Sequence, residues 1–336
     1  MTLGDPGGIG PEVALRALAA WRGRPAVSVL LLGRAAFFSA LARRLRLDLS
    51  FRDVATPVPA PVRRARELAC YFEGVFPAGR IRLGRSVAAQ TRAAVRSIAL
   101  GVRLAMSGRV DAIVTPPINK AGLGRAGFRM DGHTEYLAEL SGSRRFGMML
   151  VGGPLRVVLV TRHVALSKVP GLLTRERVRD AVLLADRELR HSFGIVRPRL
   201  VVCGLNPHAG EAGRFGREEI RTIAPGVRAA ARRIKGTVVG PLSPDVLFHD
   251  AYAGRYDAEI CMYHDQGLIP LKMISRGAGV NVTLGLPFVR TSPDHGTAYD
   301  IAPRLRADPG SMLEALETAV TLVRNRRRRA GSRRRS

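Results

Sequence analysis

Lysine and cysteine are both rare in this sequence. Arginine outnumbers lysine 50 to 4, and the three cysteines form no CxxC pair. Such spacing excludes a disulfide framework and a cysteine-based zinc motif, so we expect reduced, buried cysteines in a cytoplasmic protein. The sequence has no signal peptide, and no apolar run reaches about 18 residues, so we expect neither export nor a membrane span.

Aromatic residues are also sparse, at 5% of the chain, although the formal net charge is +27. Eight arginines fall in the last thirteen residues, and the others are not clustered with aromatics as a nucleic-acid stacking platform requires. We therefore expect no specific nucleic-acid ligand, but a basic field that attracts acidic or phosphorylated small molecules. The like-charge block at 324–336 predicts a disordered tail.

The rarity of lysine draws attention to the few that remain. Because arginine is the default cation of this chain, a retained lysine marks a place where a compact ammonium group is needed. The four are Lys120, Lys168, Lys235 and Lys272.

Short β-branched runs alternate with helical segments, which predicts an α/β fold with a mostly parallel sheet. A Gly-Gly-Pro turn at 152–154 joins two apolar runs and predicts a hairpin, hence a mixed sheet. We expect strands at 27–32, 110–115, 146–151, 155–161, 199–203, 258–263 and 280–284. We expect helices at 12–21, 35–45, 86–106, 174–193, 216–232 and 311–324.

The segments richest in chemically active residue types directly follow expected strands. Ligands of α/β folds collect at the carboxyl ends of the strands, so these segments point to one shared cleft. They are 115–120, 161–163, 204–213 and 263–265.

Five of the seven histidines lie beside strand ends in segments rich in Gly, Pro and Asn. Neutral imidazole binds Zn²⁺, Co²⁺ or Fe²⁺, and a catalytic zinc site uses three protein ligands. Spacing does not choose three of the five, since no two stand at i, i+4 and HExxH is absent. A metal site and ordinary hydrogen-bonding histidines therefore both remain open. The five are His133, His163, His208, His264 and His295.

Two further features could bind ligands. The motif GDPGGIGPE (4–12) precedes a helix, and its glycines serve either close approach of a ligand or a tight structural turn. Lys272, Asn281 and Arg290 suit a phosphate or carboxylate, with ordinary surface charge as the alternative.

Together these segments resemble the 4-hydroxythreonine-4-phosphate dehydrogenase (PdxA) family of pyridoxal phosphate biosynthesis. The resemblance runs in order along nearly the whole chain, and its most specific motifs are GLNPHAGE (204–211), MYHDQG (262–267) and VNVTLGLPFVRTSPDHG (280–296). It implies two α/β lobes with an interdomain cleft, similar to the isocitrate and isopropylmalate dehydrogenases. We expect the first lobe at 1–125 plus 285–323 and the second at 126–284.

The resemblance also implies a homodimer with its active site at the subunit interface, which the second lobe forms. It implies a divalent metal, with one ligand contributed by the partner subunit, held by His163, His208 and His264. Substrate contacts fall on His133, Thr134, Lys272, Asn281 and Arg290. It implies catalytic roles for Lys272 and for Asp245, the latter in GPLSPDVLF (240–248). We assign cofactor contacts to Gly204, Asn206 and Asp294.

The implied reaction oxidises the C3 hydroxyl of 4-phosphooxy-L-threonine with NAD or NADP. Metal-assisted decarboxylation then gives 3-amino-2-oxopropyl phosphate. A divalent ion (Zn, Co or Mg) would bind the hydroxyl and lower its pKa, while the nicotinamide takes the hydride. The alternatives are a paralogous dehydrogenase for 4-phospho-D-threonate, 4-phospho-D-erythronate or an aromatic dihydrodiol, a three-histidine metallohydrolase, and a nucleic-acid-binding protein.

The sequence departs from the family pattern at both ends. Family members usually carry a short strand before the glycine-rich motif, whereas Met1 almost abuts it here. We expect either a shortened first strand or a start that lies further upstream. The arginine-rich tail is not a family feature.

Overall fold

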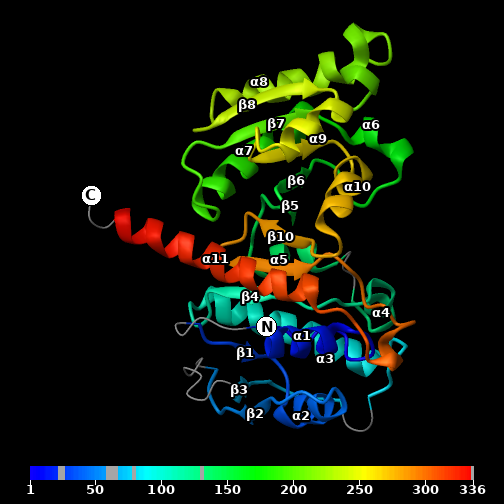
Figure 1. Cartoon of the computed structure of the whole chain (residues 1–336), viewed down its shortest axis with the longest axis vertical. Coiled ribbons are helices and arrows are strands. Elements are labelled where there is room, and N and C mark those ends of the chain that lie inside the picture. The colour runs from blue at the N-terminus through cyan, green and yellow to red at the C-terminus, as the bar shows by residue number, and fades with distance from the viewer. Residues whose placement is uncertain (22–26, 58–66, 78–80, 129–131, 334–336) are drawn as a thin grey trace. The chain divides into compact units, whose positions relative to one another are not determined.

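The computed structural model describes residues 1–21, 27–57, 67–77, 81–128 and 132–333. The chain folds into two compact units (Figure 1). Unit 1 comprises Met1–Arg144 and Leu286–Val320, and unit 2 comprises Arg145–Gly285 and Thr321–Ser336. Within the described residues no helix is long and apolar enough to span a bilayer.

Unit 1 contains a small parallel sheet and a further pair of parallel strands. In the sheet, β3 lies between β1 and β2 and pairs with both in parallel, and in the pair β4 runs parallel to β11. The strands are β1 (Leu30–Leu31), β2 (Ser50–Asp53), β3 (Glu67–Cys70), β4 (Ala112–Val114) and β11 (Val289–Pro293). The helices are α1 (Gly10–Ala20), α2 (Ala35–Arg44), α3 (Ala88–Met106), α4 (Lys120–Arg125), α5 (His133–Leu140), the 3₁₀ turn η4 (Ala302–Arg304) and α11 (Gly310–Arg333), which continues into unit 2.

The residues before the glycine-rich motif bond to two of these strands. The Met1 amino group donates to Leu30 O at 2.8 Å, Leu32 N donates to Met1 O, and Thr2 N donates to Val114 O. Met1 and Thr2 therefore bridge β1 and β4 with strand-like hydrogen bonds.

Unit 2 is built on a mixed sheet in the order β10-β5-β6-β9-β7-β8. β5 and β6 form the expected antiparallel hairpin, β10 is antiparallel to β5, and the remaining pairs are parallel. The strands are β5 (Gly147–Gly152), β6 (Leu155–Leu159), β7 (Arg199–Cys203), β8 (Thr237–Leu242), β9 (Ala258–Cys261) and β10 (Val280–Leu284). The expected α/β fold with mostly parallel strands is thus confirmed.

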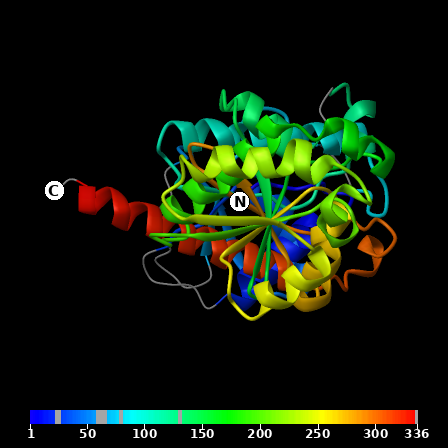
Figure 2. The ribbon, with the colours of Figure 1, turned by 90° about the horizontal axis from the view of Figure 1, so that it is seen from above.

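Helices cover both faces of this sheet, with α7 and α8 on one face and α9 and α10 on the other (Figure 2). The long helices are α7 (Arg175–His191), α8 (Ala224–Ala231), α9 (Pro244–Tyr252) and α10 (His264–Ser275). The short ones are η1 (Leu166–Lys168), α6 (Val169–Leu172), η2 (Pro207–Gly213) and the π turn η3 (Glu219–Ile223). Side chains of β5, β6, β7, β9, α9 and α10 form a common apolar core.

Two expected boundaries differ from the structure. The second lobe was expected to begin at 126, but residues 126–144 group with unit 1 because α5 packs on α3. The tail expected to be disordered from 324 is instead the end of α11, helical to Arg333. Arg326 accounts for part of this order, since it donates to the buried Glu188 carboxylate at 3.0 Å and to Ser192 Oγ at 2.8 Å.

Candidate active site

His163 and His264 lie next to each other in unit 2. His163 follows β6 and His264 opens α10, and the centres of their rings are 5.3 Å apart. Their two strands, β6 and β9, are parallel neighbours, which brings both carboxyl ends to the same edge of the sheet. Two imidazoles bound tetrahedrally to one zinc at about 2.0–2.1 Å hold their ring centres roughly 5 Å apart. The spacing of this histidine pair therefore fits a shared metal ion.

Asp265 fixes the orientation of one of these rings. Its Oδ1 lies 2.6 Å from His264 Nδ1, so this carboxylate accepts a hydrogen bond when Nδ1 carries the proton. That tautomer leaves Nε2 with its lone pair available for a metal. A carboxylate behind a metal-binding histidine is a common arrangement, and it raises the basicity of the ligand.

His208 lies elsewhere in unit 2, beside the expected catalytic Asp245. It belongs to η2, where five successive residues adopt left-handed backbone angles. Asp245 opens α9 and accepts a hydrogen bond from Ser243 Oγ. That hydrogen bond is the main cause that lowers the pKa of Asp245, and His208 contributes a smaller Coulombic effect in the same direction. Asp245 is therefore a carboxylate at neutral pH, close to one expected metal ligand.

The three expected ligands do not converge within one chain. In the part of the chain that the structure describes, no three His, Cys, Asp or Glu side chains come together as a metal site. His163 and His264 supply two imidazoles, while His208 lies apart.

A separate cationic cluster forms in unit 1 around Arg290. This side chain is 2% exposed, and its Nε and Nη2 donate to Thr115 Oγ1 at 3.0 and 2.6 Å. Burial lowers the pKa of Arg290 to about 9, opposed by the nearby carboxylate of Glu135. Arg290 therefore remains a buried cation at neutral pH, held at the end of β4 by Thr115.

His133 and Lys120 adjoin this arginine. Burial, followed by the positive charges of Arg290 and Lys120, holds the pKa of His133 well below its usual range. The imidazole is therefore neutral, and its Nε2 is buried without a hydrogen-bond partner among the described residues. Lys120 reaches the residue before His133, since a Cβ on Gly132 would lie 3.3 Å from Lys120 Cε.

This cluster suits an anion, because the cations Arg290 and Lys120 both lie near the neutral His133. Lys120 stood out in the sequence as one of four lysines, yet sequence reasoning gave it no role. Thr134, the other expected substrate contact of this segment, is 4% exposed in the first turn of α5.

The remaining expected contacts have mixed surroundings. Asn281 lies in β10 with its Oδ1 buried and without a hydrogen-bond partner among the described residues, and Lys272 is exposed in the last turn of α10. His295, which the sequence left undecided, has a buried Nε2 that likewise has no partner in the described ranges. A bound polar ligand could form the hydrogen bonds that Asn281 Oδ1 and His295 Nε2 lack.

The residues expected to contact the cofactor already have partners within the fold. The Asn206 side-chain amide donates to Glu218 and Glu219, and Gly204 O accepts from Gln266 Nε2 at 2.7 Å. Asp294 accepts a hydrogen bond from Ser311 Oγ at 3.0 Å. These bonds shape the loops after β7 and β11, and their role toward a cofactor stays a prediction.

The glycine-rich motif 4–12 forms a tight structural turn. A Cβ on Gly7 would lie 2.2 Å from Arg85 O, and one on Gly8 would lie 2.6 Å from Thr297 O. Asp5 N also donates to Pro117 O at 2.9 Å, which ties the motif to the segment that follows β4. At these two positions glycine is thus required by contacts within the protein.

Comparison with known proteins identifies a family and its members. The profile of the family described as "Pyridoxal phosphate biosynthetic protein PdxA" matches residues 26–319. A 4-hydroxythreonine-4-phosphate dehydrogenase of Geobacter metallireducens is 46% identical over 96% of this chain and 95% of its own. The enzyme of that name from Desulfosudis oleivorans is 44% identical over 95% and 94%.

Solved structures agree with this relationship. The crystal structure of a 4-hydroxythreonine-4-phosphate dehydrogenase from Burkholderia phymatum is 39% identical, with a TM-score of 0.83 over 96% of both chains. A terephthalate 1,2-cis-dihydrodiol dehydrogenase from Burkholderia xenovorans is 30% identical, with a TM-score of 0.66 over 95% and 96%. The phosphotransacetylase EutD of Staphylococcus aureus, at 13% identity and a TM-score of 0.54, shares the fold alone.

Proposed function

The chain belongs to the PdxA family, and we propose that it oxidises the C3 hydroxyl of 4-phosphooxy-L-threonine with NAD or NADP. Loss of CO₂ then gives 3-amino-2-oxopropyl phosphate, a step toward pyridoxal phosphate. The observation that carries the proposal is the near-complete match to relatives named 4-hydroxythreonine-4-phosphate dehydrogenase, at 44% and 46% identity.

The phosphate of this substrate would bind to the cationic cluster of unit 1. Arg290 is a buried cation held by Thr115, and Lys120 adds a compact ammonium beside His133. A neutral His133 can donate or accept a hydrogen bond through the unpartnered Nε2, depending on its tautomer. We assign substrate contacts in this unit to His133, Thr134, Arg290 and Lys120.

A divalent ion would be held by His163 and His264 of one chain, together with His208 of a second copy. The distance between the first two rings and the Asp265 carboxylate behind His264 support this assignment. When bound, the ion would polarise the substrate hydroxyl and the nicotinamide would accept the hydride. A second copy is needed because His208 lies apart from the other two in a single chain, so the proposal requires a homodimer.

Proton transfer would fall to side chains of unit 2. Asp245 is a carboxylate with a lowered pKa, so it can accept a hydrogen bond from a substrate hydroxyl or ammonium group. Lys272 is exposed and can donate a proton after CO₂ leaves. Asn281 would satisfy its buried Oδ1 with a substrate donor. Cofactor contacts at Gly204, Asn206 and Asp294 complete the proposed set.

Cysteine usage supports a cytoplasmic site of action. All three cysteines are free and buried, as expected where thiols stay reduced. A basic surface would also draw a phosphorylated substrate toward the enzyme.

A substrate panel followed by NADH absorbance tests this function. We expect NADH formation with 4-phosphooxy-L-threonine, and much less with 4-phospho-D-threonate, 4-phospho-D-erythronate and a cis-dihydrodiol. Preference for the dihydrodiol would point to the activity named for the relative that is 30% identical. No NADH or NADPH formation with any of the phosphorylated acids would refute the proposal.

A further inference from the structure

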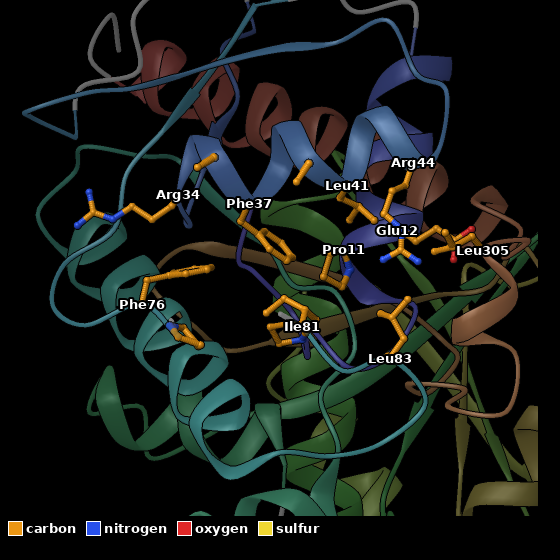
Figure 3. A pocket seen from close by; sticks show the side chains of 15 residues that line it. Pro11, Glu12, Arg34, Phe37, Leu41, Arg44, Phe76, Ile81, Leu83 and Leu305 are labelled. Atoms are coloured by element: carbon orange, nitrogen blue, oxygen red, sulfur yellow. The ribbon is translucent and has the colours of Figure 1, made fainter. Parts of the chain in front are cut away.

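The three expected metal ligands differ in the conformation of their backbone. None of them lines the cavity of about 610 Å³ in unit 1 (Figure 3), because all three lie in unit 2. Of the three, only His208 has a positive φ. The conformation of this one ligand therefore needs a physical cause within unit 2.

His208 begins a turn of five residues, 208–212, whose φ angles lie between 41° and 82°. Four of the five carry a Cβ, which in left-handed backbone approaches the following carbonyl oxygen and makes this conformation unfavourable. Packing offsets little of that cost, because His208, Glu211 and Ala212 are exposed and only Gly210 of the turn is buried. Strained backbone of this kind persists where surrounding contacts impose it, and it is concentrated at functional sites.

Glu219 supplies contacts that impose this conformation. The residue opens η3 and is 3% exposed. Its Oε1 accepts hydrogen bonds from Leu205 N at 2.7 Å and from Asn206 N at 2.8 Å, and its Oε2 accepts from Asn206 Nδ2 at 3.0 Å. Three donors of the segment before the turn thus meet one buried carboxylate. Hydrogen bonds to a charged acceptor are stronger than those between neutral groups, so this segment is held firmly.

The turn itself also packs against this carboxylate. A Cβ on Gly210 would lie 2.6 Å from Glu219 Oε2, so the backbone of the turn passes close to this oxygen. Between Asn206 and His208 lies only Pro207, whose ring fixes its φ. Glu219 therefore holds the chain on both sides of His208, and the direction of the imidazole follows from these contacts.

We propose that Glu219 is a positioning residue for the metal site, which holds the left-handed turn so that His208 points to the metal of a second copy of the chain. The inference rests on the proposed function, in which His208 completes the site of another subunit. Exposed apolar side chains beside His208 agree with a face that a second copy covers. Phe215 is 46% exposed with its ring centre 6.4 Å from that of His208, and Ile220 is 52% exposed.

Amide hydrogen exchange of the metal-free chain tests whether Glu219 holds the turn. In Glu219→Ala, peptides that cover 204–213 should exchange about tenfold faster or more, because the amides of Leu205 and Asn206 lose a charged acceptor and open locally. Exchange in α7 and α10 should stay as in wild type. Glu218→Gln is the matched control, since its carboxyl accepts from Asn206 Nδ2 whereas the two backbone amides bond to Glu219. Unchanged exchange of 204–213 in Glu219→Ala would overturn the proposal.

Zinc affinity separates a positioning role from a purely structural one. In competition with a chromogenic chelator, Glu219→Ala should bind zinc about 10- to 100-fold more weakly, the usual effect of losing a residue that orients a ligand. Glu219→Gln should lie between this variant and wild type, because its oxygen can still accept from the two backbone amides while its amide group opposes the donor Asn206 Nδ2. Glu218→Gln should match wild type. If Glu219→Ala keeps the circular dichroism spectrum and the zinc affinity of wild type, Glu219 has no such role.

Mixed dimers show which half of the metal site Glu219 serves. Heterodimers of Glu219→Ala with His264→Ala, purified through two different tags, should hold one tightly bound zinc, because one site then receives intact halves from both chains. Heterodimers with His208→Ala should hold none, because both changes fall on the same half. The reverse pattern would contradict the assignment to His208. Absence of tight zinc both in wild type and in heterodimers of His208→Ala with His264→Ala would instead refute the shared site of the proposed function, and the role of Glu219 with it.

Discussion

Asp265 has one contact that gives it a role, the hydrogen bond to His264 Nδ1 at 2.6 Å. Its carboxylate is exposed and pairs with no arginine in the described ranges, so folding gains little from it. Its effect is on the histidine, where it fixes the ring and the tautomer. Asp265 is therefore a positioning residue for the proposed metal.

Replacing this carboxylate should weaken metal binding without unfolding the chain. We expect Asp265→Asn to lower zinc affinity by about 10- to 100-fold, the usual effect of losing such a partner. Competition with a chromogenic chelator measures the affinity, and Glu317→Gln serves as a control at an exposed acid of α11. Equal affinities of Asp265→Asn and wild type would show that the contact does not serve a metal.

Glu259 is a second residue whose surroundings predict a measurable effect. It lies fully buried in β9, where burial raises the pKa of its carboxyl to about 7, although Arg156 N donates to Oε2 at 3.0 Å. The folded state binds this proton more tightly than the unfolded state. The free energy of unfolding should therefore fall as pH rises from about 4.5 to about 7.

Glu259→Gln should remove this contribution to the pH dependence. The amide oxygen can still accept from Arg156 N. At pH 8 the free energy of unfolding of the variant should exceed that of wild type by on the order of 3 kcal/mol. Urea unfolding at several pH values measures it, with Glu176→Gln as the exposed control. A difference that does not change between pH 4.5 and 8 would contradict the raised pKa.

At the scale of elements, the sequence predicted the strands that are apolar runs and missed β2, β3, β8 and β11. The apolar runs of β7 and β10 were predicted to the residue, and the Gly-Gly-Pro turn identified the β5/β6 hairpin. By contrast, no helix was predicted for the segment that forms α10, which contains Gly267 and Pro270. Tertiary packing overrides the local preference of these two residues, since a Cβ on Gly267 would lie 2.3 Å from Val157 Cγ1.

The same limit applies to the candidate site. Residue types identified five histidines, but only the fold brings His163 next to His264 and sets His208 apart. Lys120 and Arg290 are far apart in sequence, yet the charges of both act on His133, and the pairing of β4 with β11 places Arg290 beside the strand that precedes Lys120. Contacts of this kind depend on strand order, which local patterns do not encode.

The last turns of α11 were wrongly predicted to be disordered, and their contacts predict a stabilising role. Asn325 Nδ2 donates to Ser192 O at 3.0 Å, and Arg329 donates to Arg190 O at 2.6 Å. With the bond from Arg326 to Glu188, these side chains satisfy the carboxyl end of α7.

Removing residues 324–336 should lower the free energy of unfolding by about 2–3 kcal/mol, because the buried Glu188 loses its cation. A chain ending at Arg329 keeps these bonds and should match wild type in chemical denaturation. Equal stability of all three chains would mean that the arginines of the tail contribute only charge.

At the scale of the whole molecule, the proposed metal site requires two copies of the chain. If His163 and His264 come from one subunit and His208 from the other, His264→Ala and His208→Ala should each be inactive alone. A heterodimer of the two variants contains one intact set of ligands. Mixed by co-refolding, they should regain about a quarter of wild-type activity, since half of the dimers are mixed and each has one good site.

A matched mixture separates this arrangement from a site within one chain. His264→Ala mixed with His163→Ala should stay inactive, because both losses fall on the same half of the site. Absence of recovery in the first mixture, with heterodimers verified by native mass spectrometry, would contradict a shared site.

The buried cysteines can report the opening of each unit separately. Cys70 lies in β3 of unit 1, while Cys203 and Cys261 face each other across β7 and β9 of unit 2 with their sulfur atoms 3.7 Å apart, and all three are fully covered. A thiol reagent reaches each sulfur only when the strands around it separate. Alkylation for different times, followed by peptide mapping, therefore measures the rate at which each unit opens. The chain needs no engineered probe for this measurement.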